Sequence, residues 1–379
     1  MSRPLRLVQV GAGAMGRAWL DAIGRSPDTE LVGLVDLDAA VAGSALAERG
    51  IDVPVGADAV EVARLTGAEA VVDVTVPQAH LPVNLAALRS GLPVLCEKPV
   101  TPTVRDALVL IAAAEVSGRL LMVSQSRRYY AALATLRERL AGIGPVGLVT
   151  TEFMRAPHFG GFREEMDHPL LVDMAIHGFD VARYLLGTAP VAVSCWSFNP
   201  AWSWFRGDAA ATAVFEFEHG VRFQYVGSWV AAGLETSWNG TWRIGGETGT
   251  ATWDGEGEVV VQRAAGEPER TLVPPGPAES IDGSLADFVA AVRSGGSPSS
   301  GEIHENVLTL AMVEAAVRSA DTGERVEIAA LLDEACREAL DGPLDEDHRA
   351  AMKGWGSASH HLGLGATVQP ADRDQPVGA

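Results

Sequence analysis

The chain of 379 residues carries 29 Lys and Arg residues against 49 Asp and Glu residues, a formal net charge of −20 at pH 7. This length exceeds the usual size of one domain, so two domains with an appendage are expected. The negative charge would repel phosphate backbones and anionic membrane surfaces, which argues against a nucleic-acid partner.

The first predicted element is a buried strand over residues 5–10, which leads directly into a glycine-rich turn and a helix. The turn has the pattern GxGxxG in the strand–turn–helix context that this motif requires. Its first glycine permits the tight turn, its second lets the backbone approach a pyrophosphate, and its third lets the helix pack on the strand. The helix start offers free N–H donors to phosphate oxygens. The predicted cofactor-binding residues here are Gly11, Gly13, Ala14, Met15 and Gly16.

A second strand is predicted over residues 30–35, and it ends at Asp36. A carboxylate about twenty residues beyond the glycines can accept hydrogen bonds from the adenosine ribose hydroxyls. A 2′-phosphate would meet this carboxylate, and the following Leu37 and Asp38 supply no arginine to offset it. We therefore expect NAD in preference to NADP. Asp38 is available to cap the next helix, so the capping role does not require Asp36.

Strands and helices continue to alternate as far as residue 124, which predicts a parallel, doubly wound sheet of six strands. The fourth strand, over residues 70–76, ends near Thr75 and Pro77, and His80 follows at the start of the next helix. These three residues lie where a bound dinucleotide would pass and are candidate cofactor ligands. For His80, a purely local hydrogen bond is an equal alternative. Residues 1–126 are expected to form this α/β Rossmann domain.

The fifth strand ends in Glu97-Lys98-Pro99. The proline restricts Lys98 to extended geometry and stops the strand, which places a cation at the rim of the sheet. Open α/β sheets bind ligands at that rim. We therefore treat Glu97 and Lys98 as candidate cofactor-binding residues, although alone they could be an ordinary polar strand end.

The region after the sixth strand contains the other candidate site residues. Arg127 and Arg128 could contact substrate or a cofactor phosphate, or form surface ion pairs. Residues 163–186 predict a loop and then a helix, in which Asp173 and His177 are four residues apart and share one face. The ordinary pKa of histidine suits proton transfer near neutrality, and a carboxylate can orient and tune the ring. In isolation the pair could also be a plain helix-surface contact.

The second half predicts an α+β domain over residues 127–330 with a large, mainly antiparallel open sheet. Seven of the nine tryptophans fall between Trp196 and Trp253, so this sheet carries most of the aromatic surface. A C-terminal helix followed by a poorly ordered tail is expected over residues 331–379. The predicted strands of the sheet cover residues 148–154, 191–198, 210–218, 221–230, 238–246 and 249–253, and helices are predicted over 282–294 and 304–320.

The motifs VGAGAMG, VD, TVPQAH, GLPVLCEKP and DMAIH, in this order and spacing, resemble the family of glucose-fructose oxidoreductases and inositol dehydrogenases, the Gfo/Idh/MocA family. The resemblance covers roughly residues 5–330. It implies an NAD-dependent oxidoreductase acting on a secondary hydroxyl of a sugar or cyclic polyol, with Lys98, Asp173 and His177 lining the substrate site. It also implies a homodimer or homotetramer formed through the C-terminal sheet.

Within this resemblance, His177 would take the hydroxyl proton and Lys98 would stabilise the developing alkoxide, or the two roles could be exchanged. Asp173 would place His177 or grip a neighbouring hydroxyl. Two other functions stay open: a glycoside hydrolase or epimerase that retains NAD and oxidises its substrate transiently, and a non-catalytic NAD-sensing protein. The fold alone does not choose among them.

One departure from the family concerns substrate choice. Inositol dehydrogenases of the family carry a His-Arg-Asn run on the first strand of the second domain, whereas this chain has Met154, Arg155 and Ala156. Two polyol-binding groups are therefore missing. Either the nearby Arg155, His158 and His168 or the aromatic stretch over residues 199–204 could replace them, and the sequence does not decide between these alternatives. Arg155 and His158, together with Arg127, are the candidate substrate-binding residues. The spacing of His158, His168 and His177 matches no usual metal-ligand pattern, so no metal is expected.

The three cysteines are widely spaced and odd in number, which favours neither a disulfide framework nor a paired-cysteine metal motif. A reducing cytoplasm fits them best. The apolar run near the start is broken by Gly11 and Gly13 before a signal-peptide core is complete. No stretch approaches the roughly 18 apolar residues of a membrane span, so no membrane association is expected.

Overall fold

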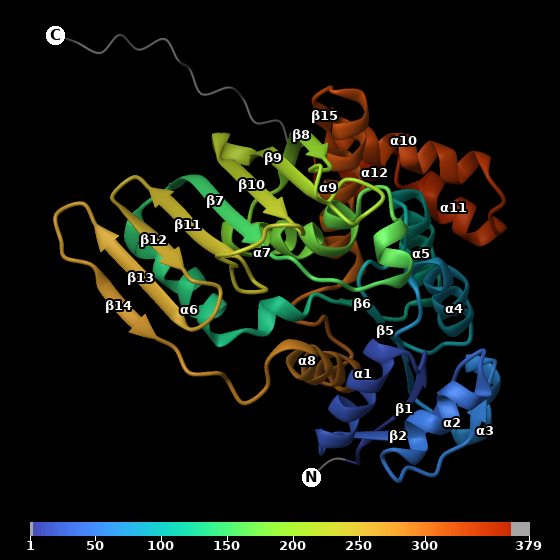
Figure 1. Cartoon of the computed structure of the whole chain (residues 1–379). Helices are drawn as coiled ribbons and strands as arrows, with labels where there is room; N and C mark the ends of the chain where they lie inside the picture. Colours follow the sequence, from blue (N-terminus) through green and yellow to red (C-terminus); the bar gives the residue numbers. More distant parts are fainter. Residues whose placement is uncertain (1–2, 365–379) are drawn as a thin grey trace.

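The computed structural model describes residues 3–364 of the chain and contains two sheets (Figure 1). The first is the predicted parallel six-stranded sheet, with the strand order β3-β2-β1-β4-β5-β6. This order reverses between β1 and β4, so their carboxyl ends border the crevice in which such sheets bind nucleotides. The strands are β1 Leu5–Val10, β2 Thr29–Val35, β3 Val55–Gly56, β4 Ala70–Asp73, β5 Val94–Glu97 and β6 Leu121–Ser124.

Strand β4 ends three residues earlier than the sequence predicts. The Asp73 carboxylate accepts hydrogen bonds from both the backbone N–H and the hydroxyl of Thr75, at 3.1 and 2.7 Å. These bonds form a turn that leads the chain out of the sheet. An aspartate side chain that binds the backbone N–H two residues later replaces the hydrogen bond that the N–H would make to a neighbouring strand.

Helices cover both faces of the six-stranded sheet. Apolar side chains of α1 and α8 pack with strand residues on one face, and α4 and α5 pack on the other. Most strand positions are buried, as expected for parallel strands covered on both sides, whereas both residues of the edge strand β3 are not. The helices of this region are α1 Ala14–Arg25, α2 Ala39–Ala47, α3 Ala59–Thr66, α4 Pro77–Arg89 and α5 Val104–Ser117.

The second sheet has nine strands in the order β14-β13-β12-β11-β7-β10-β9-β8-β15, and all pairs except β7 with β10 are antiparallel. The prediction of a mainly antiparallel sheet is confirmed, but β13 and β14 were not predicted because their short segments mix apolar with charged residues. The strands are β7 Val146–Met154, β8 Pro190–Phe198, β9 Ala210–Phe217, β10 Arg222–Ser228, β11 Thr241–Gly246, β12 Gly249–Trp253, β13 Glu258–Arg263, β14 Glu269–Leu272 and β15 Val326–Glu327.

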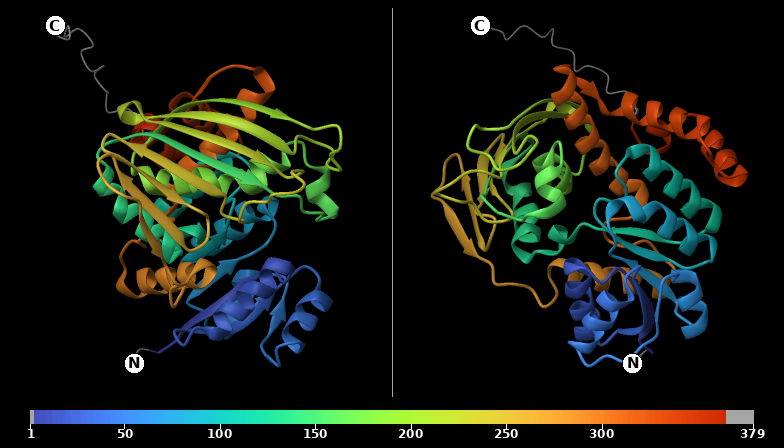
Figure 2. Two further views of the ribbon diagram at one scale, coloured as in Figure 1. Left: turned by 60° about the vertical axis from the view of Figure 1, so that its left-hand side comes forward. Right: turned by 45° about the vertical axis from the view of Figure 1, so that its right-hand side comes forward.

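Helices pack on one face of the nine-stranded sheet, and within the described residues no helix lies over the other face of its central strands (Figure 2). The helices on the covered face are α6 Ala131–Arg139 and α7 Ile176–Leu186. A π-helical turn, Leu170–Ala175, leads into α7. Burial alternates along β9 and β10, as expected for strands with one face in the core.

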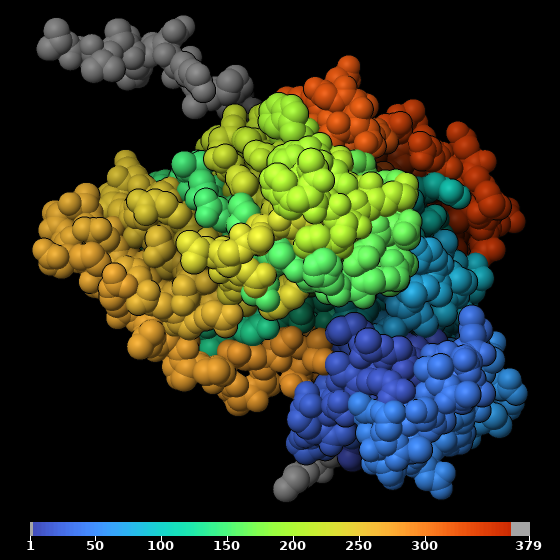
Figure 3. All heavy atoms as spheres, in the orientation of Figure 1, coloured from blue at the N-terminus to red at the C-terminus, as the bar shows by residue number. Residues whose placement is uncertain are grey.

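Two helices from the second half of the chain join the halves of the molecule. Helix α8, Ser280–Ser294, places Leu285, Phe288 and Val289 against the six-stranded sheet. In the space-filling view, the segment that contains α8 lies beside the N-terminal lobe (Figure 3). Helix α9, Ile303–Thr322, packs on β8 and on α5. The chain therefore returns to the first sheet after building the second.

The C-terminal region differs from the prediction of one helix and a poorly ordered tail. Helix α10, Ile328–Asp341, is followed by two further helices, α11 Glu346–Gly354 and α12 Ala358–His361. These short helices are held by tertiary contacts: α11 packs on α5, and Ser357 and Ser359 both bind the carboxylate of Asp333. The rest of the predicted tail, residues 365–379, lies outside the described residues. Within the described chain, no helix is long and apolar enough to cross a membrane.

Candidate active site

The glycine-rich turn has the close contacts that its sequence predicts. Gly11 has φ +98°, and a Cβ atom there would lie 2.5 Å from the carbonyl oxygen of Val74. A Cβ atom on Gly16 would lie 2.3 Å from the carbonyl oxygen of Gly11. Around Gly13, in contrast, a Cβ atom would meet nothing within 4 Å. The first and third glycines are therefore required by the fold, while the second leaves the space open.

The start of α1 is suited to an anion. Gly13 is its N-cap residue and provides no side-chain hydrogen bond, and Gly13, Ala14 and Met15 are exposed. The first N–H groups of a helix have no partners inside the helix, and the helix dipole favours negative charge there. This open, uncapped helix start fits the pyrophosphate of a dinucleotide.

Asp36 lies directly beside this turn. Its Oδ2 accepts a 2.8 Å hydrogen bond from the backbone N–H of Ala12, and its Oδ1 accepts one of 2.9 Å from the N–H of Asp38. Asp38 caps α2 by accepting from the N–H groups of Ala40 and Val41. The half-buried Asp36 is therefore oriented by backbone donors, and each of its oxygens keeps capacity for a further donor.

The residues after β4 have different surroundings. Thr75 and Pro77 are half-buried at the end of the sheet, whereas His80 is fully buried. The ring nitrogens of His80 lie 2.9 Å from the carbonyl oxygen of Pro99 and 3.1 Å from that of Thr75. His80 thus presents no surface to a cofactor and connects the two loops that border the crevice.

Two hydrogen bonds hold the Glu97 carboxylate at the same edge of the six-stranded sheet. Its Oε1 accepts a 2.8 Å hydrogen bond from the indole N–H of Trp19 in α1, and its Oε2 accepts one of 3.0 Å from the backbone N–H of Lys98. Burial raises the pKa of the Glu97 carboxyl, and these hydrogen bonds oppose that rise. Glu97 therefore ties the end of β5 to the helix that follows the glycine turn.

Lys98 and Asp173 meet across the two halves of the molecule. The Nζ atom of Lys98 lies 2.7 Å from the backbone oxygen and 3.2 Å from the Oδ1 atom of Asp173. The Oδ2 atom of Asp173 accepts a 2.6 Å hydrogen bond from Nε of Arg163. Burial acts to raise the pKa of Asp173, but the charges of Lys98 and Arg163 outweigh it and the pKa is lowered. Asp173 is therefore an anion between two cations.

His177 has surroundings that the sequence did not predict. In the described part of the chain it makes no hydrogen bond to Asp173, and its buried Nδ1 atom has no partner. The π-helical turn just before it widens the helix at Asp173, so the assumption of regular α-helical spacing fails at this point. Burial, followed by the positive charges of Arg127 and Lys98, places the pKa of His177 well below its ordinary value. The ring is therefore neutral near pH 7.

The two adjacent arginines have separate environments. Arg127 is half-buried, with its guanidinium 3.9 Å from Sδ of Met174, and burial lowers its pKa to about 10. Arg128 is buried, and it donates to both carboxylate oxygens of Asp180 and to Glu305. Arg128 is thus not in a surface ion pair, whereas Arg127 lies beside the helical turn that carries Asp173.

The other two predicted substrate-binding residues, Arg155 and His158, interact with backbone and aromatic groups of the second half. Arg155 donates to the backbone oxygen of Thr236 at 3.0 Å, and its guanidinium lies 4.6 Å from the ring centroid of Trp238. His158 stacks on Trp204 with a 3.8 Å centroid separation. Within the described residues, no hydrogen bond or ion pair joins either side chain to Lys98, Asp173 or His177.

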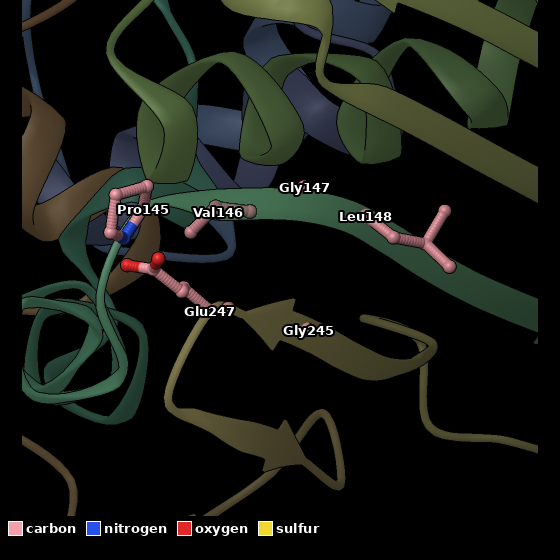
Figure 4. A pocket seen from close by; sticks show the side chains of 7 residues that line it. Pro145, Val146, Gly147, Leu148, Gly245 and Glu247 are labelled. Carbon is pink, nitrogen blue, oxygen red and sulfur yellow. The ribbon is translucent and has the colours of Figure 1, made fainter. Parts of the chain in front are cut away.

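A shallow pocket lies at one end of two neighbouring strands of the nine-stranded sheet, where β7 begins and β11 ends (Figure 4). None of the predicted site residues lines it. Its lining residues are Pro145, Val146, Gly147, Leu148, Gly245, Gly246 and Glu247.

Sequence reasoning missed two residues that complete the site. Arg163 comes from a short 3-10 helix, Gly161–Glu165, before the π-helical turn, where no motif or periodicity marks it. Trp19 fits the regular apolar pattern of α1, so the sequence gives no sign that its indole N–H donates a hydrogen bond to Glu97. Both act through tertiary contacts, one across ten residues and one across 78, and neither spacing follows a helix or strand period.

Two family models match the chain. One, described as an oxidoreductase family with an NAD-binding Rossmann fold, matches residues 5–125. The other, described as a GFO/IDH/MocA C-terminal domain, matches residues 134–252. Together they span more than half of the chain.

Curated relatives and solved structures agree with these matches. A 1,5-anhydro-D-fructose reductase from Ensifer adhaerens is 28% identical over 333 residues, which are 84% of this chain and 97% of the relative. Inositol 2-dehydrogenase 4 from Saccharopolyspora erythraea is 35% identical over 198 residues, which are 51% of this chain and 57% of the relative. An oxidoreductase from Agrobacterium radiobacter in complex with NAD+, L-tartaric acid and magnesium has a TM-score of 0.80 at 21% identity, covering 87% of this chain and 100% of that chain. At that identity, the structural likeness shows the fold.

Proposed function

Because the chain belongs to the Gfo/Idh/MocA family of NAD-binding oxidoreductases, we propose that it is a dehydrogenase acting on a secondary hydroxyl of a sugar or cyclic polyol. The names of its relatives, which include an anhydrofructose reductase and an inositol dehydrogenase, support this substrate class. The observation that carries the proposal is the contact of Lys98 with Asp173 at the rim of the nucleotide-binding sheet.

We propose NAD rather than NADP as the cofactor. The open N-terminus of α1 and the space above Gly13 fit a pyrophosphate, and the carboxylate of Asp36 is oriented beside them. A 2′-phosphate would be repelled by this carboxylate. When bound, the nicotinamide supplies the acceptor or donor of the hydride.

Lys98 has one donor left for a substrate. Its ammonium carries three N–H groups, and the backbone oxygen and carboxylate of Asp173 provide two acceptors. The third N–H can bind the reacting hydroxyl, where a positioned cation stabilises negative charge as the proton leaves. In this assignment Asp173 positions Lys98 rather than His177.

His177 is the proposed proton acceptor. Because burial and two nearby cations lower its pKa, the ring is neutral near pH 7 and one of its nitrogens has a free lone pair. A neutral imidazole can take the hydroxyl proton during oxidation and return it during reduction. Arg127, whose charge acts on this ring, is a proposed substrate-binding residue.

The activity test uses the full chain, NAD+ and a panel of sugars and cyclic polyols, with inositol among them. We expect net NADH formation, measured at 340 nm, and a weaker response with NADP+. Substrate conversion without net NADH would instead indicate a hydrolase or epimerase that retains NAD. NAD binding without conversion of any substrate would contradict an enzymatic role.

Two variants test the assigned residues. Lys98→Met and His177→Ala should each lower kcat by at least about 100-fold, the usual range for a lost acid–base or charge-stabilising group. Lys353→Met and His219→Asn are matched controls, because both residues are exposed. Near-normal turnover in either site variant would contradict the assignment.

A further inference from the structure

A cluster of three potential metal ligands lies outside the proposed active site. Glu115 comes from the end of α5, His304 from the start of α9 and His361 from α12. The Nε2 atoms of both histidines approach the same Oε1 atom of Glu115, at 3.0 Å for His304 and 2.6 Å for His361. One ligand atom from each residue lies within 4.8 Å of the other two.

The ring of His304 is oriented by a carboxylate behind it. Glu302 Oε1 lies 2.8 Å from Nδ1 of His304, and Glu302 Oε2 accepts a 2.9 Å hydrogen bond from the backbone N–H of the same residue. This arrangement leaves Nε2 facing Glu115. Histidines that bind metals almost always donate their other ring N–H to a carboxylate, carbonyl or water.

The other two groups are also held in place. Glu115 Oε2 accepts a 2.9 Å hydrogen bond from the indole of Trp355, and the Trp355 ring stacks on His361 at 4.7 Å with an interplanar angle of 12°. The side chains of Glu115, His304 and His361 keep 27%, 35% and 29% of their surface exposed. An ion in solution can therefore reach them.

We propose that Glu115, His304 and His361 bind one divalent transition-metal ion of the Zn²⁺ type. Two imidazole nitrogens and one carboxylate oxygen form a common ligand set for such an ion, and water can occupy the remaining position. With metal–ligand distances of about 2.0–2.2 Å, tetrahedral ligand atoms lie about 3.3 Å apart, so Oε1 of Glu115 needs to move away from Nε2 of His304 by about 0.3 Å and from Nε2 of His361 by about 0.7 Å. Partly exposed side chains allow that movement.

The bound ion would fasten the C-terminal helices to the rest of the molecule. Its ligands join α5 of the nucleotide-binding domain, α9 and α12, and Trp355 adds the end of α11. The role is structural, because the ligands include none of the proposed catalytic residues. A second cluster of Asp73, His80 and Cys96 is fully buried, and both ring nitrogens of its histidine face carbonyl oxygens, so it does not support the same inference.

The binding test uses the untagged full chain after treatment with a chelator. We expect one Co²⁺ ion per chain, with the visible absorption of a four- or five-coordinate site, and displacement of that ion by Zn²⁺. His361→Ala and His304→Ala should abolish the signal, and Glu302→Gln should weaken binding by about 10–100-fold. His360→Ala is the matched control, because it removes an exposed neighbouring histidine and should bind as the wild type does.

Thermal unfolding gives an independent measurement. Zn²⁺ should raise the Tm of the wild type and of His360→Ala, and should leave the Tm of His361→Ala unchanged. If a histidine variant does not fold, Glu115→Gln provides the same comparison with little change in volume. Absence of stoichiometric Co²⁺ in the wild type, or equal binding by wild type and His361→Ala, would overturn the proposal.

Discussion

At the scale of single residues, the charges around Asp173 determine the chemistry that the site can perform. Its carboxylate lies between Lys98 and Arg163, which keeps it ionised and holds the ammonium in place. For His177 the surroundings favour the neutral form, because burial and the charges of Arg127 and Lys98 disfavour its protonated form. The site thus combines a held cation with a neutral base.

The protonation state of His177 can be measured directly. Its pKa should lie well below 6.5, and Arg127→Met should raise it, because the variant removes one of the two cations that oppose protonation. The measurement is an NMR titration of histidine labelled with ¹³C at Cε1, with the signal assigned from its loss in His177→Gln. Arg222→Met, a change at an exposed strand position, should leave this pKa unchanged. A wild-type pKa at or above 6.5 would contradict the proposed neutral base.

The same shift has a defined effect on stability. An unfolded histidine has a pKa of about 6.5, so below this pH the unfolded state binds a proton that the folded state excludes. His177 therefore reduces the free energy of unfolding as the pH falls below about 6.5, by at most about 1.4 kcal/mol per pH unit. The reduction stops only when the pH reaches the lower pKa of the folded state.

Motifs located part of this site from the sequence alone. The Glu-Lys-Pro strand end and the Asp173–His177 spacing predicted residues on two elements, and the structure brings Lys98 to Asp173. The hydrogen-bond partners were less predictable: Asp173 binds Arg163 from a short 3-10 helix, and His80 is buried between two backbone carbonyl groups. Such partners depend on how distant segments pack, and local spacing carries no record of that packing.

At the scale of secondary-structure elements, α1 couples the fold to cofactor binding. Gly13→Ala should lower the Tm only by the cost of a poorer N-cap residue, because its Cβ atom meets nothing within 4 Å, but should weaken NAD binding by intruding on the pyrophosphate space. Gly16→Ala should lower the Tm, because its Cβ atom would lie 2.3 Å from the carbonyl oxygen of Gly11. Thermal unfolding and NAD titration by calorimetry check both expectations.

Gly24→Ala is the matched control within the same helix. Its Cβ atom also meets nothing within 4 Å, and it lies far along α1 from the glycine turn. Alanine in a helix interior is favoured over glycine by about 0.5–1 kcal/mol, so this variant should be slightly more stable and should bind NAD normally. Equal NAD affinity in Gly13→Ala and Gly24→Ala would contradict the assigned pyrophosphate position.

Element prediction succeeded where periodicity was strong and failed where tertiary contacts decide the structure. The six parallel strands are short apolar segments in regular alternation with helices, and all six were predicted. The π-helical turn at Asp173 has the same composition as an α-helix, so its different hydrogen bonding leaves no sequence signal. Helices α11 and α12 lie in a polar, glycine-containing segment and gain their order from α5 and Asp333.

At the scale of the whole molecule, a network of ion pairs holds the segment through which the chain passes from the first sheet to the second. Arg128, which follows the last strand of the first sheet, binds Asp180 of α7 and Glu305 of α9, while Thr309 donates to the same aspartate at 3.0 Å. The guanidinium of Arg128 is neutralised by the two carboxylates, and the Thr309 hydroxyl adds a hydrogen bond to Asp180. These contacts limit the free-energy cost of removing Arg128 and Asp180 from water. The segment that leaves the first sheet is thus fixed to two helices of the second half, directly beside Arg127.

The open face of the nine-stranded sheet leads to a prediction about assembly. Trp196 and Phe198 of β8 are 59% and 52% exposed and are two residues apart, so they lie on the same face. Large exposed aromatic side chains on one face are typical of a protein interface.

We expect a homodimer or homotetramer, and Trp196→Ser combined with Phe198→Ser should shift the molar mass from light scattering toward the monomer. Leu65→Ser, at an exposed leucine on α3 of the other domain, should leave the assembly intact. A wild-type monomer, or a double variant that assembles as the wild type does, would show that this face is not the interface.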